Sequence, residues 1–161
     1  MTNERPIKPL FILAESADTI GTGISAFSHD NYNRELGSAL INAENDAEAI
    51  SIFLNEYKDS PETLRSYAKE VERLLLWCIH VAKVNISSLR RNHLTDYQDF
   101  LKNPLPQKIW CGTATSKLKK DGTYNPDWRP FVNGLSANSI KKSINNIWFR
   151  LISSFATSIY S

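Results

Sequence analysis

One stretch of the sequence, residues 60–83, constrains the fold more than any other. Ser60 is a natural N-cap, and Pro61 suits the first helical position, where the N–H that proline lacks would have no helical partner. Apolar residues then recur at the helical spacing, at Leu64, Tyr67, Ala68, Val71, Leu75, Cys78 and Ala82. At about 100° per residue, these positions fall within an arc of roughly 100°. The stretch therefore predicts one amphipathic helix over 61–83, about 34 Å long.

Three further segments show the same period, and they predict helices over 46–58, 95–102 and 137–160. Their apolar faces consist of Ile50, Phe53, Leu54 and Tyr57 in the first, Leu94, Tyr97 and Leu101 in the second, and Ile140, Ile144, Ile147, Leu151 and Phe155 in the third. Ser136 is a suitable cap for the last of them. Together these elements predict an all-α domain built from four main helices.

Two long segments lack a helical or strand period. Residues 1–45 combine glycines with polar clusters, and we expect an N-terminal arm, partly ordered and loosely attached to a domain over 46–161. Residues 104–135 contain four prolines and three glycines, and a loop this long inside a compact domain is usually functional or disordered. The residues expected to pin this loop to the core are Trp128, Arg129 and Phe131.

The bulk composition narrows the class of protein. A chain of 161 residues, 42% hydrophobic and 22% charged, suits one globular domain and is short for an enzyme with a separate catalytic domain. No run approaches about 18 uncharged apolar residues, so no membrane span is expected, and the apolar patch over 10–14 is too short for a secretory signal. Because only two cysteines occur and Cys78 lies on a predicted buried face, we expect no disulfide framework and a cytoplasmic location.

The net charge of +2 hides an asymmetry along the chain. Residues 1–82 carry 7 Lys/Arg against 13 Asp/Glu, a net of −6, whereas residues 83–161 carry 12 against 4, a net of +8. A basic half suits a polyanionic partner, because each phosphate that a cation neutralises releases condensed counterions. The long helix adds a basic strip opposite its apolar stripe, at Arg65, Lys69 and Arg73. A merely solvated basic surface explains the charge equally well.

Two blocks of sequence, in this order and with predicted helices between them, are specific enough to suggest a family. The first lies within 46–77 and contains Thr63-Leu64-Arg65-Ser66-Tyr67 and Arg73-Leu74-Leu75-Leu76-Trp77. The second consists of Asp127-Trp128-Arg129-Pro130-Phe131, Gly134-Leu135-Ser136 and Ser139. The first block resembles the T-x-x-x-Y opening and the Arg-Leu-Leu-x-Trp-like end of the second helix in the core-binding domain of phage-type integrases, which are tyrosine recombinases. The second block is similar to the stretch that leads into the last helix of that domain, and the resemblance covers 46–161.

The resemblance implies a SAM-like all-α bundle of four main helices with a long loop before the last one. It also implies that the domain clamps double-stranded DNA through phosphate contacts, and that it acts in DNA integration and recombination as part of a phage or mobile-element integrase. In the family the catalytic residues belong to a second domain, which we expect to be absent here because the chain ends at Ser161 with a predicted helix still running. This chain would then be no enzyme. The full-length protein would be a DNA-cleaving and rejoining tyrosine recombinase that associates with itself on DNA.

The DNA contacts that the resemblance implies form three groups. The helix that faces DNA in the family would contribute Thr63, Arg65, Ser66, Lys69 and Arg73, since a helix N-terminus, hydroxyls and cations all suit phosphate oxygens. The long loop would contribute Lys119 and Lys120, with Lys117 beside them, and the start of the last helix would contribute Asn138, Ser139 and Lys142. Simpler roles stay open: Thr63 as a helix cap, Arg73 as the ion-pair partner of Glu70, and the three lysines as part of a disordered basic loop.

No set of residues for catalysis or for binding a cofactor stands out. The sequence contains no Gly-rich phosphate loop, zinc spacing or nucleophile–base set, so neither a cofactor nor a metal is expected. Cys78 and His80, for example, are two positions apart on a helix, which turns their side chains about 200° away from each other. The alternative function is a helical protein–protein interaction module with a basic surface. Salt dependence of binding to random duplex DNA separates the two functions.

Overall fold

The structure is a computed structural model that describes Ile7, Pro9, Ile50 and residues 53–84, 86–114 and 116–151. Within these residues the chain is mostly helical, and the β-pairing consists of three isolated bridges inside 111–131. The predicted all-α class is therefore confirmed. The arm predicted over 1–45 falls, apart from Ile7 and Pro9, outside the described residues.

Only part of the first predicted helix, 46–58, belongs to the described residues. Ile50 and residues 53–55 have helical backbone, and a turn follows over 56–59. The ring of Phe53, which is buried, stacks on that of Tyr67 with 6.2 Å between the ring centroids. This segment therefore packs against the helix that comes next in the chain.

That next helix, α4, spans Pro61–Trp77 and continues into a π-helical turn, η3, over Cys78–Ala82. It ends at Lys83, whose backbone is left-handed with φ of 54°. The single long helix predicted here is confirmed. The start of α4 differs from the predicted Ser60 cap in one detail. The carbonyl of Ser60 accepts the N–H of Leu64 at 2.9 Å, but the Ser60 side chain makes no capping hydrogen bond.

Helix α5 spans Arg91–Lys102 and begins four residues before the predicted 95–102. The additional turn is capped, because the backbone N–H of Arg90 donates a hydrogen bond to Nδ1 of His93 at 2.9 Å. A short helix, α6, follows over Gln107–Trp110, within the segment that the sequence predicts to be a loop.

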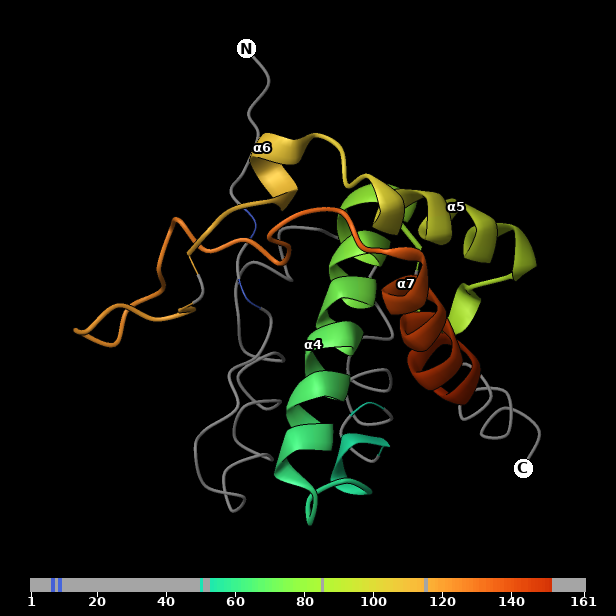
Figure 1. Ribbon diagram of the computed structural model, residues 1–161, viewed down its shortest axis with the longest axis horizontal. Helices are drawn as coiled ribbons and strands as arrows, with labels where there is room; N and C mark the ends of the chain where they lie inside the picture. The colour runs from blue at the N-terminus through green and yellow to red at the C-terminus, as the bar shows by residue number, and fades with distance from the viewer. Residues whose placement is uncertain are drawn as a thin grey trace.

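Helix α7 spans Ala137–Ser143, and a π-helical turn, η5 over Ile144–Trp148, extends it to helical residues that reach Leu151. The predicted last helix is confirmed this far, and its remainder over 152–160 lies outside the described residues. Its predicted stripe is buried, at Ile140, Ile144, Ile147 and Leu151. The far end of this helix returns to the beginning of α4, since Nη1 of Arg150 donates to the hydroxyl of Tyr57 at 3.1 Å. It thus runs antiparallel beside α4 (Figure 1).

The segment 111–131, called the basic loop below, folds back on itself. Its ends are joined where the N–H of Gly112 donates to the carbonyl of Phe131 at 2.9 Å, and its tip is closed where the N–H of Lys119 donates to the carbonyl of Thr123 at 2.8 Å. Gly122 provides the turn, with φ of 87°. The loop projects from one side of the molecule, away from α5 and α7 (Figure 1).

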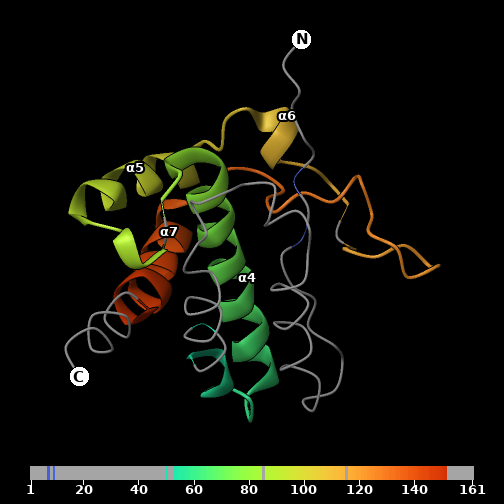
Figure 2. The same ribbon diagram turned by 180° about the vertical axis from the view of Figure 1, so that it is seen from behind.

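The second half of α4 is buried on all sides. Every residue from Val71 to Ile79 is buried, although the sequence predicts only one buried arc. On one side the ring of Trp77 lies 5.1 Å from that of Tyr97 in α5, between ring centroids. On another side the end of the basic loop packs, with Trp128 and Phe131 buried as predicted. Both views show α4 standing between the helices α5 and α7 and the base of this loop (Figures 1 and 2).

Candidate nucleic-acid interface

The first half of α4 carries an exposed cationic face. Arg65, Ser66 and Lys69 are exposed, and Thr63 is half-buried. Arg65 and Lys69 are four positions apart and so lie on the same side of the helix. Within the described part of the chain neither of them forms an ion pair. This face, Arg65 with Lys69, can therefore offer two positive charges to an anion.

The surroundings of Lys69 disfavour its charged form. The pKa of Lys69 is lowered, first because the charge of Arg73 lies nearby and second because the ammonium group is partly buried, while Glu70 acts in the opposite direction. A lowered lysine pKa means that the charged form is disfavoured in its surroundings. An anion bound at this face would relieve that repulsion.

Arg73 does not lie on the exposed face, which corrects the strip predicted from the sequence. It is 6% exposed, and its Nε donates to the carbonyl of Pro130 at 3.0 Å. Its Nη1 pairs with Oε1 of Glu70 at 2.8 Å, and its guanidinium carbon lies 4.5 Å from the centre of the Phe131 ring. The side chain thus fastens the end of the basic loop to α4, and we leave Arg73 out of the candidate interface.

A second charged contact fastens the middle of the basic loop. The side chain of Glu72 is only 3% exposed, and its Oε1 lies 2.7 Å from Nζ of Lys117, whose side chain is 25% exposed. The same ammonium lies 5.5 Å from the centre of the Trp128 ring. Lys117 is therefore engaged with α4, whereas Lys119 and Lys120 lie beyond it at the tip and are exposed.

The start of α7 presents the third predicted group. Asn138, Ser139 and Lys142 are all exposed. Ser136 caps the helix as predicted: its Oγ accepts the N–H of Ser139 at 3.3 Å and lies 3.1 Å from the hydroxyl oxygen of Ser139. The backbone N–H of Ser139 is thus used inside the cap, and its hydroxyl accepts a hydrogen bond from the hydroxyl of Ser136. The exposed side chains of Asn138 and Lys142 stay available to a ligand.

These three groups do not meet at one point. The α4 face lies toward the end at which that helix begins, α7 begins near the opposite end of the bundle, and the tip of the basic loop projects to a third side (Figures 1 and 2). A small anion could contact one group only. An extended polyanion is the kind of ligand that could reach more than one.

Comparisons with known proteins do not place the chain in a family. No protein-family model matches it, and neither a curated protein nor a solved structure does.

Neither a metal-binding group nor a membrane-spanning helix is found among the described residues. Among them, no group of three or more His, Cys, Asp or Glu side chains could hold a metal ion. None of the helices in the described ranges is both long enough and apolar enough to cross a membrane.

Sequence reasoning missed the pair Glu72–Lys117. A signal was present, because Leu74, Leu76 and Trp77 lie outside the predicted apolar stripe. A helix that is apolar on all sides is buried on all sides. A glutamate within such a stretch needs a buried cation, and a basic loop elsewhere in the sequence is the natural source.

Proposed function

We propose that this chain is a DNA-binding module of the core-binding type found in phage-integrase tyrosine recombinases, and that it holds duplex DNA through phosphate contacts. The observation that carries the proposal is the exposed cationic face of α4, where Arg65 and Lys69 have no ion-pair partner among the described residues. The mostly helical fold and the two sequence blocks described above support it.

The dimensions of α4 suit an extended phosphate backbone. The part of α4 that is not buried on all sides spans residues 61–70, a length of roughly 15 Å at about 1.5 Å per residue. One turn of B-form DNA is about 34 Å long. An exposed stretch of this length could follow the duplex for about half a turn, and it carries the charges of Arg65 and Lys69.

The charge distribution favours phosphate contacts over a neutral partner surface. Residues 83–151 contain twelve Lys/Arg and four Asp/Glu, and ten of those twelve cations are exposed. In this proposal the α4 face sets the register on DNA, while Lys119, Lys120 and Lys142 add contacts to more distant phosphates. Such contacts position a protein without reading the base sequence.

Strand cleavage would belong to a separate catalytic domain of a full-length recombinase, in which several copies assemble on DNA. Alone, the module should bind random duplex with a Kd of about 10⁻⁴ to 10⁻⁶ M at physiological salt.

The experiment compares two double variants with the same loss of charge. Arg65→Ala/Lys69→Ala removes the α4 face, whereas Arg91→Ala/Lys102→Ala removes two exposed cations from α5. Binding to a fluorescent random duplex at low salt is measured by anisotropy, and folding is checked by circular dichroism. We expect the α4 variant to bind roughly fivefold to thirtyfold more weakly, and the α5 variant to change by less than about twofold.

Equal effects of the two double variants would assign the binding to net charge rather than to the α4 face. If the folded wild-type protein binds no duplex even at low salt, the proposal is wrong and the protein–protein module becomes the better explanation.

A further inference from the structure

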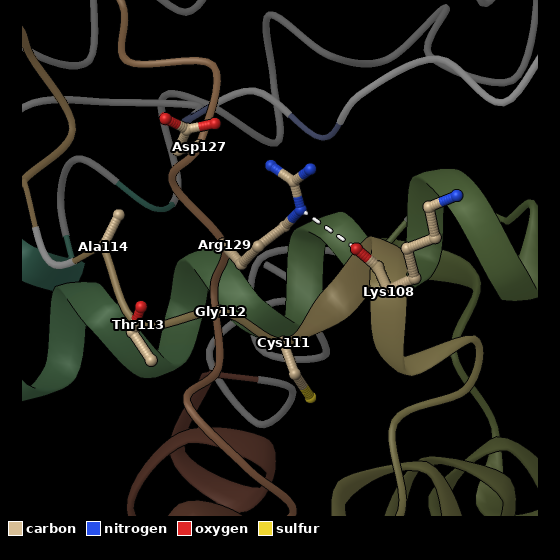
Figure 3. Close-up of a pocket in the computed structure, with 7 residues that line it drawn as sticks. All are labelled: Lys108, Cys111, Gly112, Thr113, Ala114, Asp127 and Arg129. Atoms are coloured by element: carbon tan, nitrogen blue, oxygen red, sulfur yellow. Dashed lines mark hydrogen bonds between the residues drawn. The ribbon is translucent and has the colours of Figure 1, made fainter.

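An open pocket of about 410 Å³ lies between α6 and the basic loop, apart from the α4 face (Figure 3). Lys108 of α6 lines one side of it, and Arg129 and Asp127 of the loop line the other. The sequence predicts only a structural role for Arg129. Its hydrogen bonds in the structure indicate a second one.

The guanidinium group of Arg129 is fixed but not neutralised. Its Nε donates to the carbonyl of Lys108 at 3.3 Å, and its Nη1 donates to the carbonyls of Pro126 and Trp128, both at 2.8 Å. These acceptors are neutral, and within the described residues Arg129 forms no ion pair. Of its five N–H groups, the two on Nη2 stay available. The pocket thus contains a preorganised cation.

The backbone at Gly112 allows this arrangement. A Cβ at position 112 would lie 2.9 Å from Cγ of Arg129, which is closer than side chains normally approach. Glycine therefore lets the stem of Arg129 lie directly against the chain that enters the basic loop. This contact fixes the stem of Arg129, and the three carbonyls fix its guanidinium group.

The surrounding charges favour an anion. Lys108 is exposed and pairs with no carboxylate in the described part of the chain, and it lies on the side of the Arg129 guanidinium that faces away from Asp127 (Figure 3). The carboxylate of Asp127 lies on the other side of the guanidinium and opposes anion binding. Two cations against one carboxylate leave the pocket with a net positive charge.

We propose that this pocket binds a phosphate group, with Arg129 as the anchoring donor and Lys108 as the second cation. Arginine pairs with carboxylates, and also with phosphates, frequently use two parallel N–H groups from adjacent guanidinium nitrogens. That arrangement is blocked here, because Nε and Nη1 are occupied by carbonyls. A tetrahedral phosphate has oxygens that point in several directions, so it can accept from Nη2 while the flexible Lys108 side chain turns toward it. The proposal does not depend on DNA binding by α4.

The test is a titration of the intact chain with inorganic phosphate, followed by NMR at the Arg129 guanidinium and Gly112 amide resonances, with sodium chloride at equal ionic strength as the reference. Lys108→Gln should weaken phosphate binding roughly threefold to fivefold. Asp127→Asn should strengthen it about twofold, because the opposing charge is removed. Lys58→Gln, an exposed lysine in the turn before α4, is the matched control and should change nothing.

The Lys108→Gln and Asp127→Asn variants keep the test independent of folding. Arg129→Gln should abolish phosphate binding, but it also removes the hydrogen bonds that hold the loop. Within the described residues the side chains of Lys108 and Asp127 take part in no hydrogen bond, so their variants leave the loop intact. A tighter Asp127→Asn protein is an outcome that a purely structural role cannot produce. Unchanged phosphate binding in both the Lys108 and the Asp127 variants would overturn the proposal.

The source of the phosphate is distinguished by repeating the titration with random duplex DNA and with a mononucleotide. If the Lys108 and Asp127 variants shift duplex affinity in the same directions, the pocket holds a backbone phosphate. If they shift only the affinities for inorganic phosphate and the mononucleotide, the pocket holds a small phosphate ester. Both outcomes support the site. Failure of the Arg65→Ala/Lys69→Ala variant to weaken duplex binding would contradict the proposed function but not this site.

Discussion

Glu72 of α4 and Lys117 of the basic loop form an ion pair, and removing one or the other should lower the stability of the fold by unequal amounts. Breaking a buried ion pair by removing one partner costs about 3–5 kcal/mol, because the other charge stays buried. Glu72 meets that condition, since its side chain is 3% exposed, whereas the side chain of Lys117 is 25% exposed and its ammonium can turn toward water. We therefore expect Lys117→Met to cost about 3–4 kcal/mol and Glu72→Gln about 1–2 kcal/mol.

Urea unfolding at neutral pH measures this difference. With an m-value of about 2 kcal/mol/M, Lys117→Met should lower the midpoint by roughly 1.5–2 M, without a change in m. Lys119→Met is the matched control, because Lys119 is exposed at the tip of the same loop, and it should stay within about 0.5 kcal/mol of the wild type. A Lys117→Met protein as stable as the Lys119→Met protein, or less affected than Glu72→Gln, would refute the reasoning.

Two further predictions concern the core. Tyr67 is half-buried, and the centroid of its ring lies 4.6 Å from that of Tyr57. Tyr67→Ala should therefore destabilise the fold by about 1–2 kcal/mol, less than the roughly 2–5 kcal/mol expected for Leu74→Ala, because Leu74 is fully buried. The midpoints of urea unfolding compare the two variants. The pKa of His80 is lowered, first by burial and then by the charge of Lys83. The fold therefore favours neutral His80, and its contribution to stability is complete above the unfolded pKa of about 6.5 and is lost as pH falls through the lower folded value. Wild-type Tm should drop more between pH 7.5 and pH 5 than that of His80→Gln, and equal drops would contradict this.

The helices could be predicted from the sequence where local signals determine them. The Ser60-Pro61 start and the 3.6-residue period locate α4 almost to the residue. Helix α5 begins earlier than the sequence predicts, because its cap, in which the backbone N–H of Arg90 donates to the His93 ring, uses residues that are not typical caps. Helix α6 spans four residues, Gln107–Trp110, which is too short to show a period.

The candidate interface could be predicted only in part, because local signals determine the exposure of some of its residues and distant contacts determine that of others. The exposure of Arg65 and Lys69 follows from the period of α4 alone. The burial of Arg73 depends on Pro130, which lies 57 positions further along the chain. Likewise, the pocket around Arg129 depends on how the basic loop folds back on α6. Contacts between such distant segments have no counterpart in a local pattern.

The salt dependence of duplex binding by the wild-type protein tests the central proposal most directly. Each phosphate contact contributes about 0.9 to the slope of log K against log salt concentration on B-form DNA. With at least the two contacts of the α4 face, Arg65 and Lys69, we predict that log K falls with a slope steeper than about −1.8, and equally for two unrelated duplex sequences. An affinity that does not change with salt, or no binding at low salt by the folded protein, would contradict a phosphate-contacting DNA module.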